Sequence, residues 1–432
     1  MDHLGLDLGT TTISAAVLDA HGRLLCTRTV PGGAAVAGQP WERKQDARGI
    51  ECTALSLLDG LLQEFPNIGC VGLTGQMHGI VYVDAAGQLL SPLYTWQDET
   101  GAQPGPDGKS TAARLTARTG YPLASGYGLV TLACHQAAGT IPNGAAAVCT
   151  IADYLAMRLS GRSTPRLTPS MAASLGLFDG TDFDRKAVRR AGLPEQLLPE
   201  VSEEAELGGG RLYVFAALGE NQASFLGAGQ GRLDAPLVNI GTGSQFSFFT
   251  KEHRTVPGLE TRPFPGGWLL TGAPLCGGRS FALLERFFRQ TAELVTGTPC
   301  PSAYPAMLRA LEAPMPDDVP QFRTTFAGTR QDPAERAVLS GLDEENFAPV
   351  PLLHALLRGM ADELSACYRA ALDAGCLPAG RLLGSGNGLR RNPALQRAVE
   401  RSFGLPLTLA AVPEEAACGA ALFARMGMQE AF

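Results

Sequence analysis

The sequence predicts an α/β fold organised as two domains, and three observations carry this prediction. The chain has 432 residues, which is too many for one simple hydrophobic core. Along both halves, apolar runs of strand length alternate with helical patterns. An apolar strand, a glycine–threonine turn and a second apolar strand occupy residues 4–18, and the same layout returns at residues 237–250. This repeat indicates two similar domains that face each other.

The first half predicts strands and helices from local patterns. Apolar runs bounded by turn residues predict strands, and leucines spaced three or four residues apart predict a helix. The glycine- and proline-rich segment 101–110 predicts a loop. The expected elements are the hairpin Leu4–Asp7 and Thr12–Leu18, the helix Ile50–Glu64, the strand Ile68–Leu73, the hairpin Ile80–Asp84 and Gln88–Leu90, and a strand that runs into a helix over Val148–Leu159.

We expect the domain boundary near residues 205–213, where an acidic run meets three glycines, so that the domains are 1–213 and 214–432. The second domain would then open with residues 212–231, LYVFAALGENQASFLGAGQG. Its other expected elements are two strands within Leu237–Thr250, helices at Phe281–Leu294 and Pro351–Leu372, a strand at 381–388, a helix at Asn392–Phe403, a strand at 406–410 and a helix at Glu414–Arg425.

Composition and charge exclude several kinds of partner. With 35 basic and 42 acidic residues and no basic run, the chain is not expected to bind nucleic acid or an anionic membrane. The start has no signal-peptide layout and no apolar run reaches the ~18 residues of a membrane span. Ten cysteines without a C-x-x-C pair indicate reduced packing residues rather than a zinc site. We therefore expect a cytoplasmic protein.

Two hydroxyl-rich turns are candidates for phosphate binding. In LDLGTTT and NIGTGSQ, small residues let several backbone N–H groups point at one anion, and hydroxyls add donors. Asp7, at the end of the first strand, has the ligand chemistry for hydrated Mg²⁺. The alternative is that each turn is only a hairpin that needs glycine. The Walker signature is absent, so the chain is not a P-loop NTPase.

A third glycine-rich stretch, GSGNG, follows an apolar run and precedes a helix with Asn392 near its start. Such a junction is typical of nucleotide pockets, although many α/β turns share it.

The order of these motifs resembles the FGGY carbohydrate kinases, which have the actin-like ATPase fold. The resemblance covers nearly the whole chain and includes LGLDLGTTT, GQMHG, TWQD, IADYLAMRLSG, ALGENQAS, NIGTGSQ, FAGTR-DP, GSGNG and EEAACGAAL. It implies two actin-like, ribonuclease H-like domains with a central cleft that holds ATP, Mg²⁺ and a sugar. For the phosphates and the nucleotide it implies Asp7 as the metal ligand, together with Gly9, Thr10, Thr11, Thr12, Gly241, Thr242, Gly243, Ser244, Gly384, Gly386 and Asn387.

The candidate sugar-binding residues follow two motifs. GQMHG places Gln76, Met77 and His78 after a buried strand, and YTWQD supplies Trp96, Gln97 and Asp98. Buried sugar hydroxyls need polar partners, and an aromatic face stacks on C–H groups. Taken alone, His78 also fits a hydrogen-bonded structural histidine and Trp96 a core aromatic.

The catalytic position departs from the family pattern. An alcohol acceptor needs a group that takes its proton, and the family normally uses an aspartate in a G-D-x-Q-x-S-like segment. Here that segment reads LGENQAS, so Glu220 occupies the position, while Asn221 still fits as a substrate ligand. The arginine that the family often carries after the W-x-D aspartate is missing after Asp98. The replacement of the aspartate by Glu220 affects the expected rate of turnover, and the missing arginine affects the expected sugar specificity.

The resemblance implies an ATP-dependent kinase that phosphorylates a ketose at its terminal hydroxyl, with sedoheptulose as the first expectation because YTWQD and GENQASFLGA favour sedoheptulokinase-like members. Xylulokinase-like or ribulokinase-like specificity is an alternative. A further alternative, motivated by Glu220, is a sugar- or nucleotide-binding homologue with little turnover. The expected partners are a ketose and ATP, and the expected assembly is a monomer or homodimer.

Overall fold

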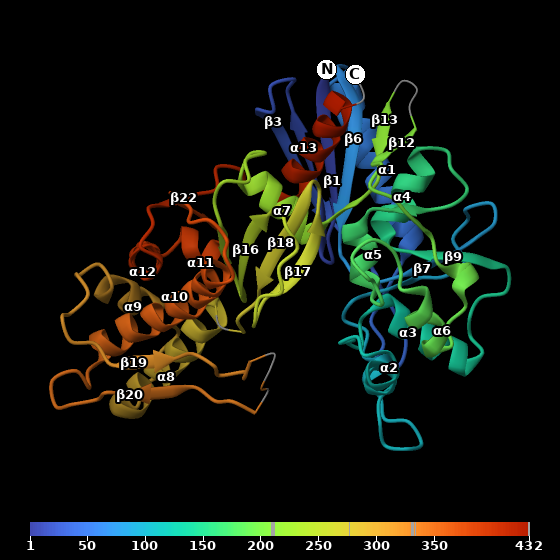
Figure 1. Cartoon of the computed structure of the whole chain (residues 1–432). Coiled ribbons are helices and arrows are strands. Elements are labelled where there is room, and N and C mark those ends of the chain that lie inside the picture. Colours follow the sequence, from blue (N-terminus) through green and yellow to red (C-terminus); the bar gives the residue numbers. More distant parts are fainter. Residues whose placement is uncertain (209–211, 276, 330–331, 333, 431–432) are drawn as a thin grey trace. The chain divides into compact units, whose positions relative to one another are not determined.

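A computed structural model describes residues 1–208, 212–275, 277–329, 332 and 334–430. It shows an α/β fold that divides into two compact units (Figure 1). Unit 1 comprises Met1–Gly231, Pro263–Pro265 and Val412–Phe432, and unit 2 comprises Arg232–Arg262 and Gly266–Ala411.

The division between the units differs from the expected boundary at 213/214, part of which (209–211) lies outside the described residues. Strands β13 (Tyr213–Phe215) and β14 (Leu218–Gly219) both pair in parallel with β6 (Ile68–Gly75) of unit 1. The following helix α7 (Glu220–Ala228) packs against α13 (Glu415–Glu430), which also belongs to unit 1. The segment expected to open the second domain therefore completes the first.

Unit 1 is built on a mixed sheet with the strand order β12-β13-β6-β1-β2-β3. Strand β1 pairs in parallel with β6 and antiparallel with β2, so the predicted opening hairpin is confirmed. The sheet strands not yet given are β1 (Asp2–Leu8), β2 (Thr12–Leu18), β3 (Leu24–Pro31) and β12 (Glu206–Gly208).

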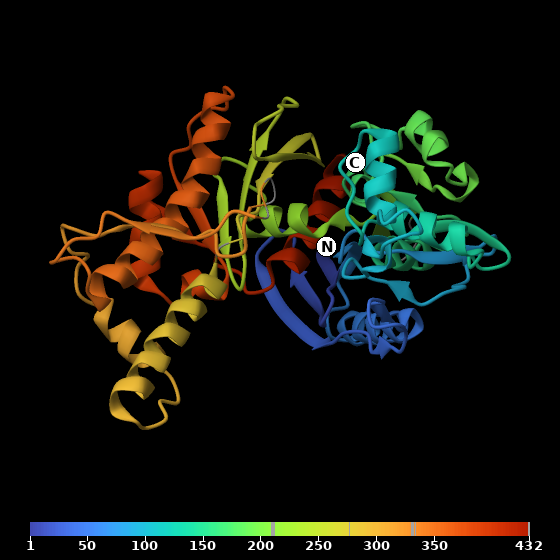
Figure 2. The ribbon, with the colours of Figure 1, turned by 90° about the horizontal axis from the view of Figure 1, so that it is seen from below.

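Two helices cover opposite faces of this sheet (Figure 2). Helix α1 (Ala47–Glu64) buries an apolar stripe that includes Ile50 and Leu58 against it. On the other face, α13 approaches so closely that a Cβ built on Gly5 would lie 1.8 Å from the carbonyl oxygen of Ala417. Glycine in the strand and small residues in the helix thus permit backbone-to-backbone packing, as the alanine-rich sequence of α13 predicts.

The remaining part of unit 1 forms smaller sheets and short helices. Strand β7 (Val81–Asp84) pairs with β9 (Ala145–Cys149). The predicted hairpin with Gln88–Leu90 is present as the antiparallel bridge Val83–Leu89, flanked by backbone hydrogen bonds from Asp84 to Gln88 (3.0 Å) and from Leu90 to Tyr82 (2.9 Å). The other elements are β4 (Ala35–Val36), β5 (Lys44–Gln45), β8 (Leu93–Tyr94), α2 (Thr111–Thr119), α3 (Gly128–Ala138), α4 (Ile151–Leu159), β10 (Arg166–Leu167), α5 (Pro169–Leu175), α6 (Arg185–Ala191) and β11 (Glu200–Val201).

Unit 2 repeats the hairpin of unit 1 within its own sheet, whose order is β17-β18-β16-β15-β21-β22. Strand β15 pairs antiparallel with β16 and parallel with β21, as β1 does with β2 and β6. Helices α10 and α12 pack on each other over an apolar core. The elements are β15 (Leu237–Ile240), β16 (Ser244–Thr250), β17 (Glu260–Phe264), β18 (Gly267–Gly272), α8 (Gly278–Thr296), α9 (Tyr304–Ala310), β19 (Gln321–Arg323), β20 (Val338–Ser340), α10 (Pro349–Asp373), β21 (Leu382–Ser385), α11 (Asn387–Arg390), α12 (Pro393–Phe403) and β22 (Leu407–Leu409).

Membrane-spanning helices and cysteines were surveyed over all the described residues. Within them, no helix has the length and apolar character that crossing a membrane would require. Nine of the ten cysteines are described and all nine are free thiols, whereas Cys276 lies outside the described residues.

Candidate functional site

Three parallel strands of unit 1 bring the candidate reactive groups to one edge of the sheet. Strand β1 ends beside Asp7, β6 leads into Gln76, and β14 leads into Glu220. The register places both Asp7 and Leu218 opposite Thr74 of β6. Because parallel strands end at the same edge, side chains from distant parts of the sequence meet there.

Asp7 lies close to two other carboxylates, those of Glu220 and Glu414, at this edge. Its Oδ1 is buried and has no hydrogen-bond partner among the described residues. Burial raises the pKa of Asp7 well above its ordinary value, and the nearby carboxylates of Glu220 and Glu414 raise it further. Glu414, whose carboxylate accepts a hydrogen bond from the Thr29 hydroxyl (3.0 Å), was not singled out from the sequence.

This environment fits a bound cation. An unpartnered carboxylate oxygen beside two further carboxylates is the chemistry that a divalent ion neutralises. The described ranges contain no cluster of three or more His, Cys, Asp or Glu side chains suited to a metal. Mg²⁺ commonly binds through one or two carboxylates and keeps several waters, so a single aspartate suffices for it.

Glu220 is the first residue of α7 and follows directly on β14. Its side chain remains open to solvent, yet the protein around it displaces enough water to raise the pKa of its carboxyl above the ordinary value. Met77 packs against the preceding Gly219, since a Cβ there would lie 3.0 Å from the Met77 Cε. Glu220 is thus an accessible carboxylate at a strand-to-helix junction.

A series of hydrogen bonds connects the predicted sugar and phosphate residues of unit 1. The Gln76 amide donates to Gln45 Oε1 (2.9 Å), and the Gln45 amide donates to the carbonyl of Thr10 (2.7 Å). The indole of Trp96 donates to the Thr10 hydroxyl (3.1 Å), while 47% of Trp96 stays exposed. Trp96 is therefore held at the surface rather than packed in the core, and Gln45 is a functional candidate that the sequence did not indicate.

The other predicted sugar residues have structural partners. His78 Nδ1 donates to the Ser174 carbonyl (2.6 Å) and its ring stacks on Tyr127, with 4.6 Å between ring centroids. Asp98 is buried, and its two oxygens accept hydrogen bonds from the backbone N–H groups of Arg43 and Thr100, 3.0 Å each. These bonds anchor the loop that presents Trp96. Sugar contacts by His78 and Asp98 remain predictions, as do those by exposed Gln97 and buried Met77 and Asn221.

In unit 1, the turn 9–12 is also fixed by its backbone. The Thr11 carbonyl accepts from Gly32 N–H (2.8 Å). A Cβ on Gly9 would lie 2.9 Å from the Thr12 carbonyl oxygen, so the turn requires glycine there. The side chains of Thr11 and Thr12 are exposed, which leaves their hydroxyls accessible to a ligand.

In unit 2, the two predicted nucleotide turns lie at one edge of its sheet. Strands β15 and β21 are parallel, and the Asn239 amide donates to the Ser385 hydroxyl across them (2.8 Å). The turn after β15 is Gly241–Ser244, and the turn after β21 contains Gly386. Gly386 has a φ of 87° and a Cβ on it would meet the Ile240 backbone, so the two turns pack through glycine.

The Gly241–Ser244 turn is held from one side and open on another. Its carbonyls at Gly241 and Thr242 accept from Gly278 and Arg279 at the start of α8 (2.9 and 3.0 Å). A Cβ on Gly243 would meet nothing within 4 Å. An open backbone of this kind lets an anion approach, which agrees with the phosphate role expected for this turn.

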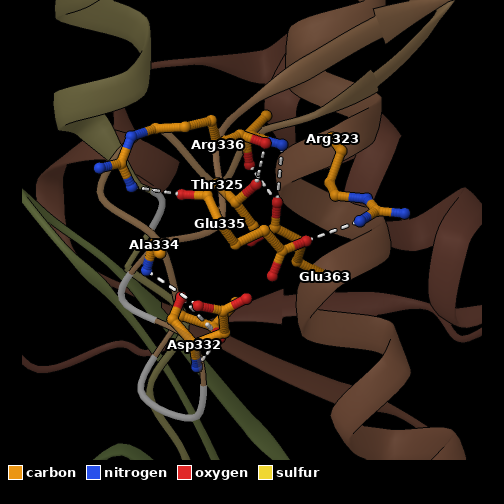
Figure 3. A network of polar contacts seen from close by, with 9 residues as sticks. Arg323, Thr325, Asp332, Ala334, Glu335, Arg336 and Glu363 are labelled. Carbon is orange, nitrogen blue, oxygen red and sulfur yellow. Dashed lines mark hydrogen bonds and ion pairs between the residues drawn. The ribbon is translucent and has the colours of Figure 1, made fainter.

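The FAGTR-DP motif belongs to a separate polar network in unit 2 (Figure 3). The Arg323 guanidinium donates to the Glu335 carboxylate (2.6 Å), and the Thr325 hydroxyl donates to the Arg336 carbonyl (3.0 Å). Glu363 of α10 accepts from the Thr324 N–H (2.8 Å). The network fastens the β19–β20 hairpin to α10; residues 330, 331 and 333 of the motif lie outside the described residues.

Comparison with known protein families matches both halves of the chain. Residues 3–230 match the N-terminal domain of the FGGY family of carbohydrate kinases, and residues 237–428 match its C-terminal domain. Sedoheptulokinases of Mus musculus and Homo sapiens are each 28% identical over 97% of this chain and 96% of their own length. A xylulose kinase of Streptomyces coelicolor is 26% identical over 97% of this chain and 86% of its own.

Solved structures show the same fold. A xylulose kinase from Brucella ovis aligns with a TM-score of 0.82 at 23% identity, covering 100% of this chain and 91% of its own. A xylulose kinase from Rhodospirillum rubrum aligns with a TM-score of 0.81 at 22% identity, covering 99% and 90%. The fold is thus the two-domain actin-like ATPase fold. The chain belongs to the FGGY family of carbohydrate kinases and is a sugar kinase, for which the family implies ATP as cosubstrate.

Proposed function

We propose that this kinase transfers the γ-phosphoryl group of ATP to the terminal hydroxyl of a ketose, and that the ketose is sedoheptulose, giving sedoheptulose 7-phosphate. The observation that carries the chemistry is the meeting of Asp7 and Glu220 at one strand edge, beside the Gln76–Gln45–Thr10–Trp96 hydrogen bonds. The choice of sugar is supported by the two sedoheptulokinases that match over nearly the full length of both chains.

In the proposed reaction, the sugar hydroxyl oxygen bonds to the γ-phosphorus as the bond between that phosphorus and the ADP oxygen breaks. Glu220 accepts the proton of the hydroxyl. The turns 9–12 and Gly241–Ser244 bind the phosphates through N–H and hydroxyl donors. Mg²⁺ held by Asp7 supplies charge neutralisation when bound. Trp96 stacks on the C–H face of the sugar, and Gln76 and Asn221 bind its hydroxyls.

Glu220 is the residue on which this proposal depends. Its carboxylate is one methylene longer than the aspartate of the family pattern, which moves the oxygens by about 1 Å, and a ~1 Å misplacement can cost ~100-fold in rate. We propose that the strand-to-helix junction of this chain places the longer side chain correctly. Because a proton acceptor must be ionised, activity should rise with pH as Glu220, whose pKa is raised, loses its proton.

The test measures ADP release with sedoheptulose, xylulose and ribulose at equal ATP and Mg²⁺. We expect the highest kcat/KM with sedoheptulose and a ~100- to 10,000-fold fall in kcat for Glu220→Ala. Glu203→Ala, which removes an exposed carboxylate of the same unit, is the matched control and should leave kcat unchanged. Folded protein that releases no ADP with any of the ketoses would overturn the proposal.

A second candidate function is a binding homologue with little turnover, which the replacement of aspartate by Glu220 favours. The variant Glu220→Asp separates the two. A wild type that binds sugar and ATP without turnover, together with an active Glu220→Asp, would establish the binding role. A fast wild type and a slower Glu220→Asp would exclude it.

A further inference from the structure

Unit 2 contains a cavity of about 270 Å³ away from the two nucleotide turns. It lies among α10, α12 and the segment that follows α9, and none of residues 241–244 or 384–387 lines it. Its volume is just below the ~300–1,000 Å³ of pockets for drug-sized ligands, so it suits a smaller molecule. The apolar part of its wall is formed by Pro314, Met315, Leu357, Ala394 and Ala398.

Two arginines from one face of α12 give the cavity positive charge. Arg397 and Arg401 are four residues apart, and both line it. Arg397 donates to the Leu311 carbonyl (3.0 Å) and Arg401 donates to the Met315 sulfur (3.2 Å). Neither guanidinium forms an ion pair with a carboxylate of the described residues, although Glu312 also lines the cavity. Most of their N–H donors therefore remain available to a ligand.

A buried histidine completes the polar wall. His354 of α10 lines the cavity and is 5% exposed, and its Nε2 is buried without a hydrogen-bond partner in the described part of the chain. Burial, and then the charges of Arg397 and Arg401, lower the pKa of His354. An unpaired buried nitrogen is unfavourable, and an anion between the arginines and the ring would favour the charged imidazolium.

We propose that this cavity binds a small phosphate group, either inorganic phosphate or the phosphate of a small ester, between Arg397, Arg401 and His354. Guanidinium groups form paired hydrogen bonds to phosphate oxygens, and an imidazolium adds a further donor. The apolar wall accommodates a short carbon chain next to the phosphate. The site is independent of the proposed sugar specificity, because it uses no residue of the kinase site.

The experiment follows the histidine ring signals of the full-length protein by NMR while inorganic phosphate, and separately glycerol phosphate, replaces chloride at constant ionic strength. His354→Gln identifies the His354 signal. We expect a saturable shift of that signal and a rise of the His354 pKa, because the bound anion stabilises the protonated ring. Glu312, which lines the same cavity, repels a bound anion, but its single negative charge is outweighed by the two arginines. Tighter binding of glycerol phosphate would identify an ester, and equal binding would identify inorganic phosphate.

The variant Arg397→Met/Arg401→Met tests the arginines. Each lost charged hydrogen-bonding group should weaken phosphate binding about tenfold or more. Arg309→Met removes an exposed arginine that does not line the cavity and should leave binding unchanged. The proposal is overturned if phosphate causes no saturable shift of the wild-type His354 signal, or if the double variant binds as tightly as the wild type.

Discussion

Replacing Gly419 by alanine tests how the carboxylate of Glu220 is positioned. Gly419 lies in α13, where that helix crosses α7, the helix that begins at Glu220 (Figure 1). A Cβ built on Gly419 would lie 1.8 Å from the carbonyl oxygen of Ala223, and one built on Gly227 would lie 1.9 Å from that of Glu415. The two helices therefore touch backbone to backbone through a glycine on each side.

The geometry gives the size of the effect. Real Cβ atoms essentially never come within 3.0 Å of such an atom, so the helices must separate locally by about 1.2 Å. Overpacking of this kind costs about 1–3 kcal/mol. In an exposed helix interior the same change stabilises by about 1 kcal/mol, because alanine has the higher helix propensity. Because the clash is with backbone atoms, we take the upper end of the overpacking range, and after the ~1 kcal/mol propensity gain we expect Gly419→Ala to destabilise the fold by about 2 kcal/mol.

The assay is urea unfolding, followed by circular dichroism, together with the kinetics of ADP release. With m near 3 kcal/mol/M, a loss of 2 kcal/mol lowers the midpoint by about 0.7 M. Because α7 would carry Glu220 about 1 Å away, kcat should fall by ~100-fold. Gly60→Ala in α1 is the matched control, since a Cβ there meets nothing within 4 Å, and it should stabilise. A Gly419→Ala protein as stable as Gly60→Ala would refute this account of the packing.

Two further predictions concern buried carboxyl groups. Burial raises the pKa of Asp153 from 3.8 to about 7, so the folded state holds its proton more tightly and stability should fall as pH rises between those values. The urea midpoint of the wild type should be lower at pH 8 than at pH 5, and this difference should be smaller in Asp153→Asn. An equal difference between the two pH values in both proteins would contradict the prediction. Asp7 also has a raised pKa, caused by burial, Glu220 and Glu414, so Asp7→Asn should raise the unfolding midpoint at pH 8 while lowering kcat at least about 100-fold. A variant that is both less stable and fully active would show that Asp7 carries neither role.

The sequence predicted what depends on local pattern. The two hairpins whose turns are Gly9–Thr12 and Gly241–Ser244 were predicted from apolar runs interrupted by small residues, and both are present. The division between the units was not predictable in this way. It depends on the pairing of Leu218 with Thr74, 144 residues earlier, and on a helix that returns from the end of the chain.

The same distinction applies to the site. Asp7 was predicted from its place at the end of an apolar strand, and Glu220 from the resemblance of LGENQAS to the catalytic segment of the family; both roles stay predictions, and the structure brings the two residues to one edge of the sheet. Gln45 was missed because nothing in WERKQD marks it, and its role arises from bonds to Thr10 and Gln76, 35 and 31 residues away. Asp98 has a structural role that its motif did not indicate, since its two oxygens accept hydrogen bonds from the backbone N–H groups of Arg43, 55 residues earlier, and of Thr100, while its sugar contact stays a prediction.

Because α13 returns to unit 1, the sheet edge that carries Asp7 and Glu220 depends on segments from both ends of the described chain. Gly5 and Gly72, which pair with each other, leave a patch of bare backbone at the centre of one face of β1 and β6, and α13 packs on that patch through Ala417 and Ala420. Without the helix, this face of two central strands would be exposed to water, and α7 would lose the surface on which it packs. Glu220 begins α7, so the position of the proposed base is set by the last helix of the chain as well as by β14. A segment ending at Gly231 would thus retain every predicted sugar residue. It would still lack α13, whose packing against α7 holds the carboxylate of Glu220 in place.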